Sequence, residues 1–138
     1  MEAAPRSSTV LLITPFEDER EMYELSLRLA GFDVVVRGTT RGAVRLAAER
    51  AAAAVVLRIR QDGGPNGIEF TRLLKTTPRT RHIPAVVIST SIEPEVRSAA
   101  FAAGCDQFIL LPSPPDVLAD EVHAAIRRSF NVDRENRS

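Results

Sequence analysis

Residues 9–37 read TVLLITPFEDEREMYELSLRLAGFDVVVR, and this stretch decides the fold class. Its first six residues are apolar or β-branched, which is typical of a strand buried on both faces of a sheet. Acidic residues at 17–21 favour the start of a helix, and Gly31 favours its end. Residues 32–37 then return to a strand. A strand, a helix and a second strand in this order form the repeating unit of a parallel sheet.

The same alternation continues along the rest of the chain. It predicts further strands at 52–59, 84–90 and 107–111, and further helices at 40–50, 68–75 and 95–103. A last helix is expected after an N-cap at Ser113, with an inward stripe made of Leu118, Val122, Ala125 and Ile126. We expect residues 1–8 to be an N-terminal extension, 9–130 to be the domain and 131–138 to be a frayed polar tail. Five strands alternating with five helices predict a parallel sheet covered on both faces, with its sites beyond the carboxyl ends of the strands.

Length and composition limit the class of protein further. A chain of 138 residues fits one domain. Its 18 basic and 18 acidic residues leave no basic surplus, which argues against a nucleic-acid partner. The single cysteine, Cys105, cannot form an internal disulfide and is expected to be a buried, inert thiol. No apolar run approaches the ~20 residues that span a membrane, so we expect a cytoplasmic domain without membrane contact.

Four stretches of the chain resemble the receiver domain of bacterial response regulators. They are VLLI…EDEREM…LAGFDV within 10–34, GGPNGIEFTRLLK at 63–75, HIPAVVIST at 82–90 and AAFAAGCDQFILLP at 99–112. The resemblance covers about 9–128 and implies a flavodoxin-like, doubly wound (βα)5 α/β fold with strand order 2-1-3-4-5. Flavin- and cobalamin-binding domains share this topology. However, the chain has neither a phosphate loop rich in Ser, Thr and Gly after its first strand nor an Asp-x-His-x-x-Gly motif.

The resemblance also implies where phosphorylation chemistry would lie. A working receiver accepts a phosphoryl group on an Asp at the end of the third strand. Two neighbouring acids after the first strand hold Mg²⁺, and a Ser or Thr and a Lys contact the phosphate. In this chain the acid pair falls on Thr14 and Pro15. The acceptor position falls on Arg58 or, if the following loop has no extra residue, on Ile59. The hydroxyl position falls on Ser89, the Lys-Pro pair on Leu111 and Pro112, and the aromatic switch position on Phe108.

These substitutions remove the reacting groups. A guanidinium or an alkyl group offers no carboxylate nucleophile, and Mg²⁺ prefers carboxylate oxygens that are missing at these positions. We therefore expect a pseudo-receiver: a non-enzymatic signalling module without metal or cofactor that acts by binding proteins. Two rivals remain at this stage. One is a domain that binds an anion or small ligand at Arg58, and the other is a phosphoacceptor that uses a displaced acid such as Asp62.

Single polar residues have more than one interpretation. Arg58 is expected either to pair with Glu17, Asp18 or Asp62 across the vacated pocket or to point outward from the sheet edge. His82 and His123 have no neighbouring cluster with metal-ligand spacing, so both are expected to be surface histidines.

Two surfaces are candidates for protein contacts. The helix at 17–30 should bury Tyr23, Ser26, Leu27 and Ala30, which leaves a second apolar stripe at Met22, Leu25 and Leu29. That stripe is either an exposed contact surface or, if the helix is rotated, part of the core. In receivers this helix docks kinases and phosphotransfer proteins, so the expected partner is a histidine kinase, a phosphotransfer protein or another regulator. The resemblance further implies a homodimer face on the last two helices and the fifth strand, where the charged residues are Glu93, Glu95, Arg97, Asp116, Asp120, Glu121 and Arg127.

Overall fold

The computed structural model describes residues 8–59 and 65–137, which form a parallel sheet with the strand order β2-β1-β3-β4-β5. The strands are β1 (Thr9–Ile13), β2 (Asp33–Arg37), β3 (Ala54–Arg58), β4 (Ala85–Ser89) and β5 (Gln107–Leu110). The helices are α1 (Glu17–Leu29), α2 (Ala43–Glu49), α3 (Pro65–Thr76), α4 (Pro94–Ala102) and α5 (Pro115–Arg137). The predicted fold class and strand order are confirmed.

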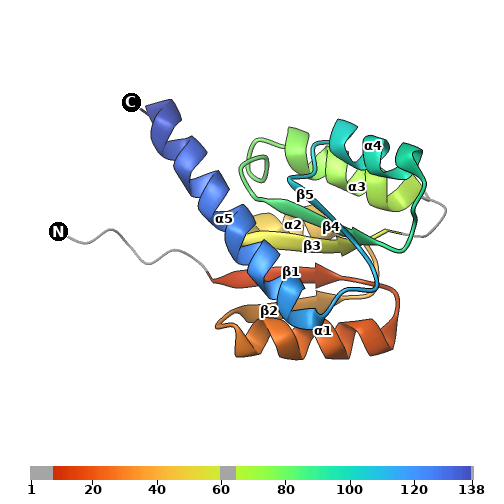
Figure 1. The fold of residues 1–138 in the computed structure, drawn as a ribbon. Coiled ribbons are helices and arrows are strands. Elements are labelled where there is room, and N and C mark those ends of the chain that lie inside the picture. The colour runs from red at the N-terminus through yellow and green to blue at the C-terminus, as the bar shows by residue number, and fades with distance from the viewer. Residues whose placement is uncertain (1–7, 60–64, 138) are drawn as a thin grey trace.

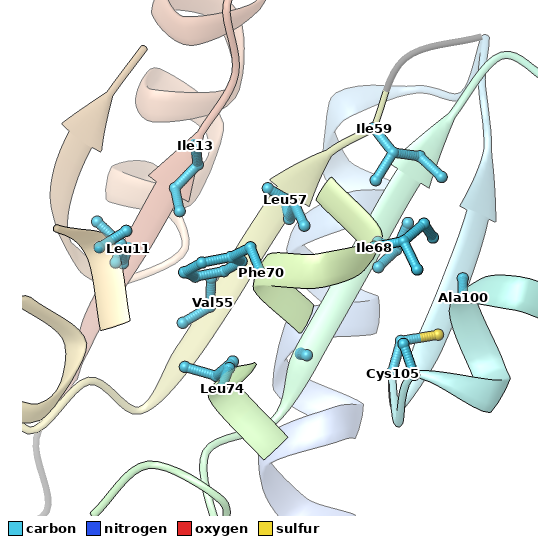
Figure 2. Close-up of a cluster of buried hydrophobic side chains, with 14 of the residues drawn as sticks. Leu11, Ile13, Val55, Leu57, Ile59, Ile68, Phe70, Leu74, Ala100 and Cys105 are labelled. Carbon is cyan, nitrogen blue, oxygen red and sulfur yellow. The ribbon is translucent and has the colours of Figure 1, made fainter. Parts of the chain in front are cut away.

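Helices cover the sheet on both sides, with α1 and α5 on one face and α2, α3 and α4 on the other (Figure 1). Successive residues of a strand point to opposite faces, so each central strand contributes to two cores. Val10 and Val56 pack with Tyr23, Leu27 and Val122 on the α1–α5 side. On the opposite side, Figure 2 shows Leu11, Val55 and Leu57 near Phe70 and Leu74 of α3, with Cys105 close to Ala100 of α4. The expected burial of the Cys105 thiol is confirmed, with 6% of the residue exposed.

Two glycines end helices in a conformation that other residues rarely adopt. Gly31 follows α1 with φ 101°, and Gly104 follows α4 with φ 105°. The Gly31 N–H donates to the carbonyl of Arg28, which satisfies one of the free carbonyls at the end of α1. Gly31 was expected at the end of its helix from the sequence.

The last helix differs from its prediction at both ends. It begins at Pro115, so Pro114 rather than Ser113 precedes it, and it continues to Arg137 in place of the frayed tail predicted from 131. Neither glycine nor proline follows Pro115, so no residue interrupts the helix. The C-terminal turns of α5 extend beyond the sheet (Figure 1). Although α5 has 23 residues, neither it nor any other helix within residues 8–59 and 65–137 combines the length and hydrophobicity that a membrane crossing requires.

The inward face of α5 agrees with the sequence, apart from one histidine. Leu118, Val122 and Ala125 are buried, and Ile126 is half-buried. His123, expected at the surface, is instead half-buried: its ring centroid lies 4.4 Å from that of Phe32, and its Nε2 lies 3.2 Å from the Ala30 carbonyl oxygen. The reason is that α5 crosses the end of α1 at this point. His82 is exposed, as expected.

Candidate functional site

The candidate site lies where β1 and β3 end. Ile13 and Leu57 are paired in register on these neighbouring strands, so the next residues, Thr14 and Arg58, emerge at the same edge of the sheet. Pro15 follows Thr14 and leads into α1, whose first turn faces this edge. The residues expected at the acid pair and at the acceptor position are therefore brought together.

Arg58 points inward and forms an ion pair with Glu19 of α1. Its Nε donates to both carboxylate oxygens of Glu19, at 3.1 and 3.2 Å, and the two side chains are 7% and 21% exposed. Its Nη1 donates to the carbonyl of Ile59, and its Cζ lies 5.0 Å from the centroid of the Phe16 ring. The alternative in which Arg58 points outward is wrong.

The expectation that Arg58 pairs with Glu17 or Asp18 is wrong. Glu17 and Asp18 are both exposed, whereas Glu19 is the acid of α1 that faces β3. Asp62, the third proposed partner and the proposed displaced acceptor, lies outside the described residues. A signal for Glu19 was present: it lies four and eight residues before Tyr23 and Leu27, the two buried positions of the helix, and therefore on the same face.

Thr14 completes the hydrogen bonds around the carboxylate. This residue is fully buried, and its Oγ1 donates to Glu19 Oε1 at 3.0 Å while accepting from the Phe16 N–H at 3.2 Å. Its carbonyl accepts from Arg20 Nη1 at 2.9 Å. Across the described part of the chain, every buried side-chain nitrogen and oxygen has a hydrogen-bond partner. A buried charge needs such compensation, because its desolvation otherwise costs several kcal/mol.

The charges of Glu19 and Arg58 also affect the pKa of Tyr23, which lies nearby on α1. Burial raises the pKa of its hydroxyl above the ordinary value, the Glu19 carboxylate raises it further, and Arg58 partly offsets both effects. The phenol therefore stays protonated beside the ion pair.

The structure distinguishes the two candidates for the acceptor position. Ile59 is 1% exposed and packs into the core under α3, together with Ile68 (Figure 2). Arg58 is the residue directed toward Thr14 and α1. Of the two candidates for the acceptor position, Arg58 is therefore the one at this edge, and its guanidinium is already paired with Glu19.

At the β4–β5 side of the edge, Ser89 is also engaged in hydrogen bonds to neighbouring backbone groups. Ser89 is fully buried, its Oγ accepts from the Ser91 N–H at 3.0 Å, and its carbonyl accepts from the Leu111 N–H at 2.7 Å. Leu111 is buried and precedes Pro112 through a cis peptide bond. Phe108 at the switch position is 8% exposed, and Arg97 Cζ lies 5.8 Å from its ring centroid.

The donor set at this edge does not fit Mg²⁺. The carboxylate that the described residues place there, Glu19, is bonded to Arg58 and Thr14, and the guanidinium would repel a divalent cation. In the described ranges, no group of three or more His, Cys, Asp or Glu residues is arranged to hold a metal ion.

The two candidate contact surfaces are exposed. Met22, Leu25 and Leu29 are 43%, 61% and 79% exposed, so the stripe lies at the surface and the rotated-helix alternative is wrong, while its role in protein contacts stays a prediction. Glu95, Arg97, Asp120 and Arg127 are exposed on α4 and α5. Phe101 of α4 and Leu110 of β5, which are 41% and 46% exposed, were not predicted from the sequence as part of this surface. The Cζ of Arg97 lies 5.2 Å from the centroid of the Phe101 ring.

The sheet order and the placement of the loops at its carboxyl edge define a CheY-like, flavodoxin-like receiver fold. No family model matches the chain. The chain is 27% identical over 127 residues to the phosphate regulon transcriptional regulatory protein PhoB of Pseudomonas aeruginosa, covering 92% of this chain and 55% of PhoB. It is 33% identical over 115 residues to PhoB of Klebsiella pneumoniae, covering 81% of this chain and 50% of PhoB. The chain thus spans about half the length of these relatives.

Solved structures show the same fold. A putative response regulator from Chloroflexus aurantiacus matches with a TM-score of 0.79 and 21% identity, covering 88% of this chain and 98% of that one. An atypical orphan response regulator, described as having a phosphorylation-independent regulatory mechanism, matches with a TM-score of 0.73 and 23% identity, covering 86% and 95%. Together with the PhoB similarity, these structures support a receiver domain of the response-regulator type.

Proposed function

We propose that the chain is a receiver-like module of two-component signalling that acts by binding proteins, without phosphorylation of an aspartate. The observation that carries this proposal is Arg58 at the end of β3, buried and paired with Glu19. The proposal is compatible with the fold, because the atypical orphan regulator of the same fold is described as having a phosphorylation-independent regulatory mechanism. We also propose that the module is not an enzyme and takes neither metal nor cofactor.

The chemistry of the edge supports this proposal over its rivals. An acyl phosphate needs a carboxylate nucleophile, and Arg58 has none. Anion binding by Arg58 has weaker support, because Nε is directed at both oxygens of Glu19 and the side chain is only 7% exposed. A cytoplasmic location remains a prediction that rests on the single cysteine.

Intact-mass measurement after incubation with Mg²⁺ and acetyl phosphate tests this proposal. We expect no gain of a phosphoryl group and no change in the amide NMR spectrum on addition of Mg²⁺ and beryllofluoride. A phosphoryl gain that disappears in the Asp62→Asn variant would support the displaced-acceptor alternative and end the proposal. Asp106→Asn, which changes an acid far from the acceptor position, is the matched control.

A homodimer through α4, β5 and α5 is the second part of the proposed mode of action. It is supported by exposed Phe101 and Leu110, with Arg97 stacked on the former and the charged residues of α4 and α5 around them. Sedimentation velocity over a concentration series should show a dimer that Phe101→Glu disrupts. Leu73→Glu, at an exposed position on α3, should leave it intact. A wild-type chain that stays monomeric throughout the series would exclude this dimer.

A further inference from the structure

Strand β2 lies at one end of the strand order, next to β1, and forms an edge of the sheet (Figure 1). Its sequence is DVVVR, with three consecutive β-branched residues. An edge strand presents backbone donors and acceptors to other chains, and β-branched residues favour strand pairing. The edge of β2 is therefore a place where another strand could add to the sheet.

The backbone of β2 shows which groups face this edge. The Asp33 N–H and the Arg37 carbonyl both form hydrogen bonds of 3.1 Å to the residues that flank β1. The backbone groups of successive residues in a strand point alternately to its two sides. Val34 and Val36 therefore direct their carbonyls away from β1, toward the open edge.

Two arginine side chains occupy these outward carbonyls. The Arg28 Nη2 of α1 donates to the Val34 carbonyl at 3.0 Å, and the Arg37 Nη1 donates to the Val36 carbonyl at 2.8 Å. Glu24, one turn earlier on α1, pairs with Arg28 at 3.0 Å and helps to hold it in place. A strand that adds to this edge would have to displace both guanidinium groups from acceptors that it needs.

The edge is complementary to itself. If a second copy lies antiparallel with Val35 opposite Val35, Asp33 of each copy lies opposite Arg37 of the other, and both of these side chains are exposed. Opposite charges directly across a ladder stabilise it. In the same register Val34 lies opposite Val36, and the outward backbone groups of the two residues can exchange a pair of hydrogen bonds.

We propose that the β2 edge is a latent self-pairing surface for a second copy of this chain, which Arg28 keeps closed. On pairing, Arg37 exchanges its bond to the Val36 carbonyl for an ion pair with Asp33 of the second copy. Arg28 gains no such substitute when it leaves the Val34 carbonyl, so it is the residue that opposes pairing. This surface is separate from the proposed dimer face on α4, β5 and α5, and the inference does not depend on how the chain is regulated.

Sedimentation velocity of Arg28→Ala, over a concentration series, tests the role of this arginine. Arg45→Ala is the matched control, because Arg45 also pairs with a glutamate four residues away, at 2.8 Å, and its loss removes the same charge. Both substitutions are made in a Phe101→Glu background, which removes association through α4, β5 and α5. We expect Arg28→Ala to self-associate at a concentration at least about tenfold lower than Arg45→Ala does.

Hydrogen exchange shows whether the association uses β2. The amides of Val34 and Val36 should gain protection as the concentration of Arg28→Ala rises. A substitution that only destabilised the fold would instead speed exchange throughout the sheet.

A charge swap tests the register. Arg28→Ala/Arg37→Asp and Arg28→Ala/Asp33→Arg, in the same background, each place like charges opposite one another, so each alone should stay monomeric. Their equimolar mixture should dimerise, because every contact between positions 33 and 37 then joins Asp to Arg. The inference fails if Arg28→Ala associates no more readily than Arg45→Ala, if the protection lies away from β2, or if the mixture stays monomeric. None of these results alters the phosphorylation measurement, so the two proposals fail separately.

Discussion

The buried guanidinium of Arg58 is compensated by the Glu19 carboxylate and the Ile59 carbonyl, which accept its hydrogen bonds, while Thr14 donates to the same carboxylate. The substitution at the end of β3 is visible in the sequence, and so is the expectation of an acidic partner. The identity of that partner depends on the rotation of α1, which places Glu19 inward and Glu17 and Asp18 outward. The spacing of Glu19 from Tyr23 and Leu27 contained this information. Acidic residues are common in the first turn of helices for electrostatic reasons alone, so the acids at 17–19 did not single out Glu19 as the partner of Arg58.

The Arg58–Glu19 pair should stabilise the native state as a unit. Removing one partner leaves the other charge buried, so Glu19→Gln is expected to lower the free energy of unfolding by about 2 kcal/mol, less than for a fully buried pair because Glu19 is partly exposed. A double-mutant cycle with Arg58→Met, measured by urea unfolding, should give a coupling energy of about 1 kcal/mol or more. The exposed Arg45–Glu49 pair on α2 is the control and should give less than about 0.5 kcal/mol. Equal coupling in the two pairs would contradict the special role of Arg58.

Cys105 makes the stability of the chain depend on alkaline pH. Burial, together with the neighbouring Asp106, raises the pKa of the thiol from 9.0 to about 11. Between these values the unfolded chain loses the thiol proton while the folded chain keeps it, so stability falls as pH rises from about 9 to about 11. Urea unfolding across this range should show a smaller loss in Cys105→Ala than in the wild type. The same measurement on Tyr23→Phe gives the contribution of Tyr23, whose pKa is also raised, for comparison with that of Cys105. Identical slopes for the wild type and Cys105→Ala would exclude this contribution.

At the scale of the helices and strands, local residue patterns predicted the positions of most of them. β-branched runs marked the strands, and glycines marked the ends of α1 and α4. The polar residues after 130 predict a tail, but no helix-breaking residue is present there and α5 continues to Arg137. Polarity alone does not end a helix whose inner face is already anchored, as Leu118 and Val122 anchor α5.

Helix α1 offers a direct test of its two apolar faces. Leu27 is fully buried and Leu25 is 61% exposed, although they are separated by a single residue. Leu27→Ala should lower the free energy of unfolding by about 2–5 kcal/mol, because it leaves a cavity in the core. Leu25→Asp should lower it by less than about 0.5 kcal/mol, as at other exposed positions. Chemical denaturation of the two variants measures the difference. A large loss of stability in Leu25→Asp would show that this side chain is buried and would remove it from the exposed stripe.

For the whole molecule, the fold and the chemistry of the edge are set by different residues. The two cores consist of apolar side chains on both faces of the sheet, whereas Thr14, Pro15 and Arg58 lie at its carboxyl edge. The receiver fold is therefore compatible with Thr14, Pro15 and Arg58 at this edge. This separation explains why the alternation of apolar runs predicted a parallel sheet covered on both faces, whereas the ion pair of the edge depended on the orientation of a single helix turn.

The same separation predicts that a divalent-cation site can be built into this fold. The variant Thr14→Asp/Pro15→Asp/Arg58→Asp places three new carboxylates beside Glu19, so it should be less stable than the wild type without metal, because like charges repel. With a dissociation constant of about 1 mM, Mg²⁺ at about 10 mM would restore about 1.4 kcal/mol. Thermal unfolding should therefore show a higher Tm with MgCl2 than with NaCl of equal ionic strength, whereas the wild type should show no difference. If the triple variant does not fold, Pro15→Asp/Arg58→Asp serves in its place. A folded variant whose Tm ignores Mg²⁺, or a wild type whose Tm responds to it, would show that the charge at Arg58 does not control metal binding at this edge.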